Sequence, residues 1–265
     1  MLLILSNIFT FENVNQVAMS LIVEYVKPNP SISFFVESFW MLHNDSGEDM
    51  NVVIVPDGRI DLFFSRSATE PFHISLMGLS TQPEQPVIAA GTLIFAVSFN
   101  LPATEYIFHR TVEADNAAFL PIDFWGFSAD DLTDFNQFCK KTAQKIQELL
   151  PAEIDNRKQQ LFELLYASNG AITVKELAQK VFWSSRQMNR YFNQQYGISL
   201  KAYSDILRFR ASFKHISEGK LFPEQNFADQ SHFIKAVKKL SGVSPSALHR
   251  NKNGRFVQFS TLRSR

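Results

Sequence analysis

The sequence has almost no cysteine: Cys139 is the one thiol among 265 residues. A single thiol excludes an intrachain disulfide, so the fold does not depend on an oxidising compartment, and we expect a cytoplasmic protein. Long apolar runs are absent as well, since none approaches the roughly 18 residues of a membrane helix, and we expect no membrane partner. The stretch "MLLILSNIFTF" is apolar but has no basic leader and no convincing cleavage site. We therefore expect residues 1–18 to be a weakly structured extension.

Patterns for catalysis and metal binding are also missing. No histidine or cysteine pair has metal-ligand spacing, and there is no nucleophile elbow, P-loop or dinucleotide fingerprint. His43 and His73 are isolated, and Asp57 and Asp61 lie four residues apart around an expected turn. We interpret these two aspartates as turn residues with solvated side chains. The sequence therefore predicts no enzyme activity, no metal and no cofactor.

The formal net charge of the whole chain is zero, because its two parts carry opposite charges that cancel. Residues 1–169 carry 9 Lys and Arg residues against 21 Asp and Glu residues, a net charge of −12. Residues 170–265 carry 17 against 5, a net charge of +12. A short, strongly basic segment fused to an acidic one is typical of a domain that binds a polyanion.

The acidic part begins with short apolar runs separated by turn formers, from Leu21 to about Phe127. In "NVVIVPDGRIDLFFS" two such runs flank residues 56–59, which predicts a hairpin. We expect a mostly antiparallel β domain over residues 19–150. Residues 1–169 also hold 17 of the 26 phenylalanines. They could line an apolar pocket, but aromatic residues that alternate on strands are more typical of a plain core.

Helices follow the strands. Apolar residues recur at helical spacing from about Leu132 to Leu149, and Pro151 ends this helix. A linking helix is expected within residues 151–169, from about Ala152 to Ala167. The boundary to the basic part falls at residues 168–170.

The basic part opens with a predicted helix-turn-helix. Thr173 and Glu176 form a capping box that starts one helix, and Ser184 and Gln187 start the next, which Gly197 ends. On a helical wheel, the second of these helices has an apolar side. The opposite side carries Arg186, Arg190, Asn193 and Gln194 and no acid. Arginine and amide side chains can hydrogen-bond base edges in the DNA major groove.

A long helix is then expected from Ser199 to about Gly219, as a rod that holds a second unit. Asp229 caps the next helix and Gly242 ends it, and Ser244-Pro245 opens one more. The polar side of the helix between Asp229 and Gly242 consists of Gln230, His232, Lys235, Lys238 and Lys239, which suits a phosphate-facing surface.

In their order and spacing, "LAQKVFWSSRQMNRYFNQQYGISLKAY", "RFRASF" and "FADQSHFIKAVKKLSGVSPS" resemble the AraC (AraC/XylS) family of bacterial transcription regulators, over residues 172–250. The resemblance implies that both recognition helices enter the major groove. One departure is that only "GKLFPEQNFADQ" precedes Asp229, so the second unit lacks a full scaffold helix and is shortened. Carried over by motif and helix face, the expected DNA-binding residues are Ser185, Arg186, Gln187, Asn189, Arg190, Asn193, Gln230, Ser231, His232, Lys235, Lys238 and Lys239.

The expected fold class is α+β: an N-terminal mostly antiparallel β domain with following helices, then an all-α domain (residues 170–250) of two helix-turn-helix units, the second shortened, joined by a long helix. Residues 251–265 are expected to be a basic tail. The resemblance implies double-stranded DNA and RNA polymerase as partners. The stretches "SFFVESFW" and "VPDGRIDLFFS" are similar to the β-rich sensor-type domains that precede this module in some family members. That similarity implies a regulatory or dimerising role, with a small-molecule effector and a second copy of the chain as further partners. Two alternatives are a non-specific architectural or RNA-binding protein, and an enzyme or carrier built on the β domain.

Overall fold

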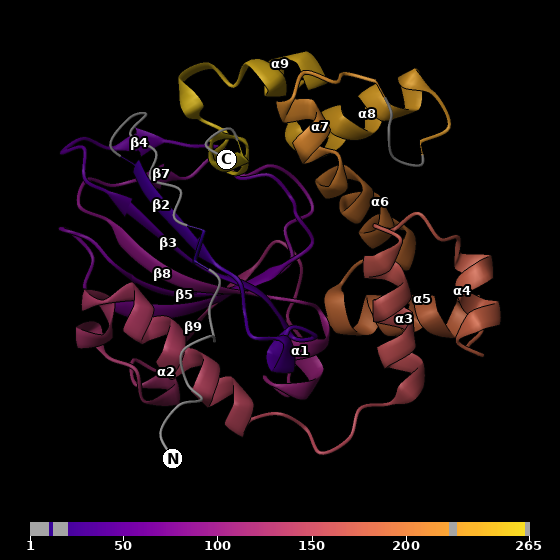
Figure 1. The fold of residues 1–265 in the computed structure, drawn as a ribbon, viewed down its shortest axis with the longest axis horizontal. Helices are drawn as coiled ribbons and strands as arrows, with labels where there is room; N and C mark the ends of the chain where they lie inside the picture. Colours follow the sequence, from indigo (N-terminus) through magenta and orange to yellow (C-terminus); the bar gives the residue numbers. More distant parts are fainter. Residues whose placement is uncertain (1–10, 13–20, 223–226, 263–265) are drawn as a thin grey trace.

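The computed structural model describes residues 11–12, 21–222 and 227–262, and it has an α+β fold (Figure 1). An antiparallel sheet comes first, and helices follow it in the chain. Of the expected extension, only β1 (Phe11–Glu12) falls within the described residues. None of the described helices combines the length and the apolar character that crossing a bilayer requires.

Within the described residues the main sheet has seven strands, and every neighbouring pair in it is antiparallel. A separate pair joins β4 (Met50–Asn51) to β7 (Val87–Ile88). In spatial order the main sheet consists of β1, β2 (Leu21–Val26), β3 (Val36–Asn44), β8 (Leu93–Phe99), β5 (Ile60–Arg66), β6 (His73–Met77) and β9 (Ala117–Leu120).

Helix α2 (Phe135–Glu148) covers one face of this sheet (Figure 1). Phe138 meets Phe64 of β5 and Phe95 of β8 at ring-centroid distances of 5.1 and 5.4 Å. The sequence predicts this helix from about Leu132, but a 3-10 turn (Ala129–Thr133) comes first. The α-helix begins only after Asp134, because that carboxylate accepts a hydrogen bond from the backbone N–H of Gln137 and caps the helix there.

The predicted hairpin at residues 56–59 is wrong. Strand β5 pairs with β6 and β8, and residues 52–55 turn away from it. Their backbone groups bond elsewhere: Val52 N–H to Pro86 O, Ile54 N–H to Glu84 O and Val53 N–H to Arg255 O. A run of apolar residues before a turn therefore finds its partners far along the chain instead of in the next strand.

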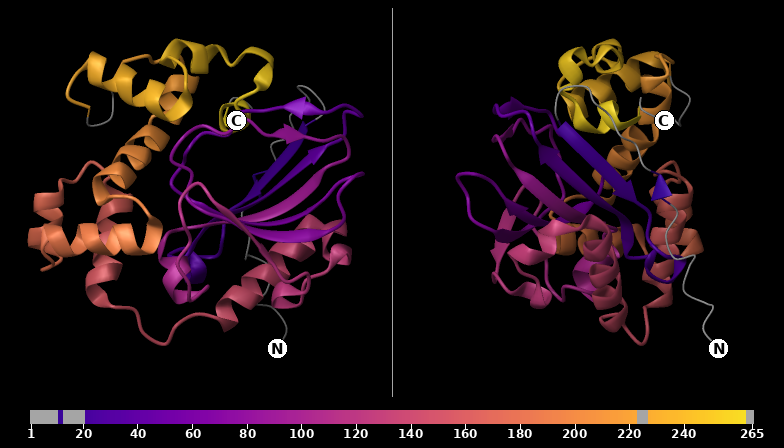
Figure 2. Two further views of the ribbon diagram at one scale, coloured as in Figure 1. Left: turned by 180° about the vertical axis from the view of Figure 1, so that it is seen from behind. Right: turned by 60° about the vertical axis from the view of Figure 1, so that its left-hand side comes forward.

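The helical part curves around the side of the sheet, with α3 to α6 beside it and α7 to α9 above it in Figure 1. Figure 2 shows the same arrangement from behind. The predicted caps are confirmed at Thr173, Ser184, Ser199, Asp229 and Ser244. The helices are α1 (Pro102–Tyr106), α3 (Asn156–Ala167), α4 (Val174–Lys180), α5 (Ser185–Tyr196), α6 (Leu200–Ala211), α7 (Phe213–Ser217), α8 (Gln230–Ser241), α9 (Pro245–Arg250) and α10 (Val257–Leu262).

The expected rod from Ser199 to Gly219 consists of two helices, α6 and α7, so one continuous long helix is wrong. The break is at Ser212, whose Oγ donates to Phe209 O at 2.6 Å, a local bond that competes with the helical ladder. Helix α8 contacts α6, and α9 contacts α7. Between α7 and α8, the described residues 218–222 and 227–229 contain no helix, as the shortened second unit requires. Pro223 lies outside the described residues.

One hydrophobic core runs through both parts of the chain. It includes Phe39 and Val55 of the β domain together with Phe192, Tyr203 and Leu207 of the helical part. Because an apolar interface of this kind resists domain motion, the two parts form one packed body.

Gly58 is a point of close contact between the backbone of the β domain and α6. Its φ is +80°, and Tyr203 Oη donates to its carbonyl at 3.2 Å. A Cβ at this position would lie 3.2 Å from Leu207 Cδ2 and 3.3 Å from a ring carbon of Tyr203. Glycine therefore supplies both the backbone conformation and the space for α6.

Residues 255–258, which we call the clasp, bring the chain back to the β domain. Phe256 forms a parallel bridge with Val53, and Val257 N–H donates to Val53 O at 3.2 Å. The Gln258 amide pairs with the backbone of Val55 through bonds of 3.3 and 3.0 Å. Phe256 is buried, so the segment expected as a basic tail contains an ordered contact with the β domain.

We predict that Gly58→Ala lowers the free energy of unfolding by about 2 to 4 kcal/mol, from backbone strain and from overpacking against α6. The matched control is Gly47→Ala, because Gly47 has φ +75° and no atom within 4 Å of a built Cβ. The control should lose only the backbone part, about 1 kcal/mol. Urea denaturation of both variants measures the difference, and equal losses would contradict tight packing at Gly58.

Candidate nucleic-acid interface

Helix α5 is held by its apolar face. Met188, Phe192 and Tyr196 are fully buried, and Phe162 of α3 packs on Phe192 at 5.8 Å and on Tyr196 at 6.2 Å. Helix α4 contacts α5 as the other member of the pair. The expected linking helix α3 is thus part of the packing that fixes the orientation of α5.

The opposite face of α5 is exposed. Arg186, Arg190 and Asn193 all lie on it, next to Ser185 at the helix start. Asn189 is half-buried, and its amide donates to Ser185 O at 3.0 Å. The Asn193 amide donates to Asn189 O at 2.9 Å. The expected contact residues of the first unit therefore lie on one acid-free helix face.

Gln187 has a structural task on the same helix. Its Oε1 accepts from Ser184 N–H at 3.1 Å and from Ser184 Oγ at 2.7 Å, and Ser184 Oγ accepts from Gln187 N–H. This reciprocal capping box fixes where α5 begins. The amide that we expected at the DNA is engaged at the helix start.

Helix α8 has the same two-sided arrangement. Phe233, Val237 and Leu240 are buried, and the six expected contact residues are all exposed. Gln230 Nε2 donates to Leu221 O at 2.6 Å, and the His232 ring nitrogen Nδ1 lies 3.3 Å from Ala228 N–H. These two side chains tie the loop before α8 to its first turn. The six are Gln230, Ser231, His232, Lys235, Lys238 and Lys239.

The cations of α5 and α8 differ from those of α6 in their ion pairs. Arg208 pairs with Asp205, and Arg210 of α6 reaches Glu37 of β3 at 2.9 Å. Within the ranges that the structure describes, Arg186, Arg190, Lys235, Lys238 and Lys239 have no carboxylate partner. Their charge is therefore available to an external anion.

A cavity of 620 Å³ lies between three parts of the structure: the sheet face opposite α2, helix α6 and the clasp. Asp61 lines it, so the interpretation of Asp61 as a solvated turn residue is wrong. The residue lies in β5 and accepts from Ser98 Oγ and, at 3.3 Å, from Trp40 Nε1. Asp57 does occupy a turn, where it accepts from Arg59 N–H at 3.1 Å. Among the described phenylalanines of residues 1–169, only Phe63 lines this cavity. The buried ones belong to the hydrophobic core.

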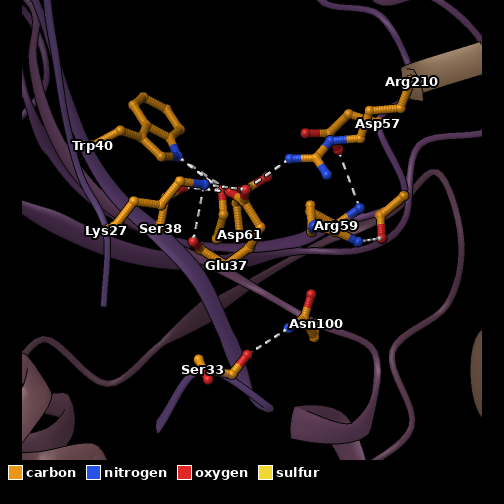
Figure 3. Close-up of polar contacts among 12 residues, drawn as sticks. Lys27, Ser33, Glu37, Ser38, Trp40, Asp57, Arg59, Asp61, Asn100 and Arg210 are labelled. Carbon is orange, nitrogen blue, oxygen red and sulfur yellow. Dashed lines mark hydrogen bonds and ion pairs between the residues drawn. The ribbon is translucent and has the colours of Figure 1, made fainter. Parts of the chain in front are cut away.

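An ion cluster joins the β domain to α6 at one end of the cavity (Figure 3). Glu37 accepts from Lys27 at 2.6 Å and from Arg210 at 2.9 Å. The register of β3 shifts between Val36 and Ser38, so Glu37 sits at a bulge and shares the cavity side with Ser38. Burial alone raises the pKa of Glu37, but Arg210, Arg59 and Lys27 hold it well below its ordinary value.

Sequence reasoning did not find this cluster. A signal was available only for Asp61, which shares a strand face with Phe63, whereas a solvated face usually carries polar side chains alone. The partner Arg210 gave no such signal, since it lies far along the chain. Among the described residues, no three His, Cys, Asp or Glu side chains gather in a geometry that could hold a metal ion.

Comparison with known proteins gives three results. The family described as "Domain of unknown function (DUF6597)" matches residues 24–115. No curated protein matches the sequence. Among solved structures, the chain is similar to ToxT from Vibrio cholerae, with 10% sequence identity and a TM-score of 0.41 over 78% of this chain and 96% of that chain.

Two further ToxT structures from Vibrio cholerae are similar to a comparable extent. The structure with a bound unsaturated fatty acid has 8% identity and a TM-score of 0.43, over 90% of this chain and 97% of that chain. The structure bound to (E)-4-(8-methylnaphthalen-1-yl)but-3-enoic acid has 10% identity and a TM-score of 0.45, over 82% and 96%.

We predict that Ser184→Ala lowers the free energy of unfolding by about 1 kcal/mol, because α5 loses its cap. The neighbouring change Ser185→Ala should stay within about 0.5 kcal/mol of the parent, since that side chain is exposed. Urea denaturation of the two variants distinguishes the capping serine from the expected DNA-contact serine. A larger loss for Ser185→Ala would show that the start of α5 is misassigned.

Proposed function

We propose that this protein is a sequence-specific, DNA-binding transcription regulator of the AraC type. One observation carries the proposal: α5 and α8 each bury an apolar face and expose an acid-free face whose cations have no carboxylate partner in the described part of the chain. A helix of this kind fits the major groove, because arginine and amide side chains can hydrogen-bond base edges there and the cations can meet the flanking phosphates.

The two helices have different tasks in this proposal. Arginine can bond guanine O6 and N7 at once, so Arg186 and Arg190 read base edges. The lysines of α8 act as point charges on phosphates, where they raise affinity for any sequence. Ser185, Asn189 and Asn193 lie beside the arginines and complete the contact face of the first unit.

The β domain acts as the regulatory part. Its contacts with α6 and the clasp hold the helical part in one orientation, and the cavity between them offers a place where a small molecule can influence both. Pairing of two chains through the β domain, and contact with RNA polymerase in the cytoplasm, belong to the same proposal.

The test begins with duplexes selected from a random pool by the full chain. The double change Arg186→Ala and Arg190→Ala should remove most of the preference for a selected duplex over random DNA, about 1 to 3 kcal/mol for each lost bidentate pair. Competition binding measures that ratio. Arg66→Ala is the matched control, because Arg66 is an exposed arginine of the acidic part, and it should leave the ratio unchanged. Unchanged selectivity in the double variant would contradict base readout by α5.

We expect a different result for Lys235→Ala combined with Lys238→Ala. Affinity should fall for all duplexes alike. The negative slope of log K against the logarithm of the salt concentration should become shallower by about 2, because two phosphate contacts are lost. Binding titrations over a range of salt concentrations measure this slope. Lys140→Ala, which removes an exposed lysine of α2, should leave it unchanged. If the parent protein selects no sequence at all, the result would instead support a non-specific architectural nucleic-acid-binding protein.

A further inference from the structure

We infer that the cavity between the sheet, α6 and the clasp binds an organic cation, a primary ammonium on an aromatic or alkyl body, with Asp61 as the residue that holds the ammonium. The binding site is argued from the cavity alone. Its role as an effector site rests on the function proposed above.

The cavity face of the sheet places a polar row beside an aromatic row. Ser38, Ser98 and Asp61 are cross-strand partners on β3, β8 and β5. In the adjacent row Ala96 lies between Trp40 and Phe63, whose rings meet edge to face at 5.3 Å. Ala96 is fully buried between them, so Trp40 and Phe63 form an apolar wall of the cavity, against which an aromatic or alkyl group can pack beside Asp61.

Asp61 is the residue of this face with unused bonding capacity. Both of its donors, Ser98 Oγ and Trp40 Nε1, bond the same oxygen, Oδ1. Within the described residues Oδ2 has no hydrogen-bond partner, and no Lys or Arg forms an ion pair with this carboxyl. A carboxylate removed from bulk water and left without a counter-charge is costly, and a bound ammonium would relieve that cost.

Four cations line the cavity, and three of them already bind groups of the protein; the fourth, Lys214, is exposed and has no ion pair within the described residues. Lys27 and Arg210 both bind Glu37. Arg59 Nη1 donates to Gly58 O at 3.1 Å, and its guanidinium lies 5.3 Å from the ring centre of Tyr166. Arg59 Nε has no hydrogen-bond partner, but it is fully buried and not open to the cavity. Lys27, Arg59 and Arg210 are therefore engaged within the protein, whereas the Asp61 carboxyl keeps one oxygen free for a ligand.

The rest of the cavity suits an apolar body. Its volume of 620 Å³ falls within the range of about 300–1,000 Å³ that is usual for small-molecule sites. Beyond the aromatic row it is lined by aliphatic side chains from both domains. They include Leu42, Val52, Ile54, Ile88, Ile94 and Val257.

The ionisation of Asp61 makes the charge of the ligand testable. Burial and the neighbouring Asp57 carboxylate raise the pKa of Asp61 to about 7. An ammonium binds the ionised form, so its affinity should rise with pH, by about tenfold from pH 6 to pH 8 for a pKa of about 7. An anionic ligand would bind better to the protonated form and show the opposite trend. The other charged groups that line the cavity are Lys27, Glu37, Asp57, Arg59, Glu84, Arg210 and Lys214.

The experiment compares two probes on the full chain without DNA. Tryptamine and indole-3-propionate share an indole and a two-carbon linker and differ in the charge of the end group. Isothermal titration calorimetry at pH 6 and pH 8 should show binding of tryptamine, tighter at pH 8. Stronger binding of indole-3-propionate, no binding of tryptamine at millimolar concentration, or an affinity that falls with pH would overturn the inference.

The change Asp61→Asn keeps the side-chain shape and removes the charge. It should weaken tryptamine binding at pH 8 at least tenfold and abolish its pH dependence, while Asp45→Asn, an exposed loop carboxyl, should change neither. Unchanged affinity in Asp61→Asn would overturn the inference, and the pH series on the parent protein decides the matter if this variant does not fold. Selective DNA binding without tryptamine binding would refute only this inference, and the reverse would refute only the proposed function.

Discussion

The arrangement of the whole molecule depends on one apolar core that passes from the sheet into the helices without a break. Tyr203 and Leu207 of α6 lie against the backbone of Gly58, and the same core continues to Phe192 of the first helix pair. Because cores are close-packed, α6 cannot shift against the sheet without loss of these contacts. The directions in which α5 and α8 point, and the closure of the cavity, therefore follow from the same packing.

Charge is distributed around this core in a consistent way. An ion pair also joins the acidic and basic parts of the chain, because the half-buried carboxylate of Glu37 takes one cation from each part, Lys27 and Arg210. The lowered pKa of Glu37 keeps this carboxylate ionised, so that it stabilises the joint between the two parts. The remaining cations of α5 and α8 are turned outwards. The protein is thus neutral as a whole, but its negative and positive charges are concentrated in different parts of the chain.

Local signals in the sequence were sufficient to predict most helices. They were insufficient to predict the contacts that join the β domain to the helical part. A capping box depends on residues three positions apart, so the starts at Thr173 and Ser184 could be predicted. The wrong hairpin had a long-range cause, because Val53 bonds Arg255 instead of a strand that is near in sequence. The break at Ser212 reflects a competing side-chain bond that propensity alone does not reveal. The expected DNA-contact residues are exposed except for the half-buried Asn189, and their contacts with DNA stay a prediction.

The clasp also bears on how the chain is assembled on the ribosome. Residues 52–55 emerge early, yet the groups that satisfy Val53 and Val55 belong to residues 255–258, which are synthesised after both domains. During translation this stretch of the β domain must wait with open backbone groups, and an exposed edge of that kind is prone to pair with other chains. The acidic surroundings of the β domain, with a net charge of −12 over residues 1–169, would keep nascent chains apart in that interval.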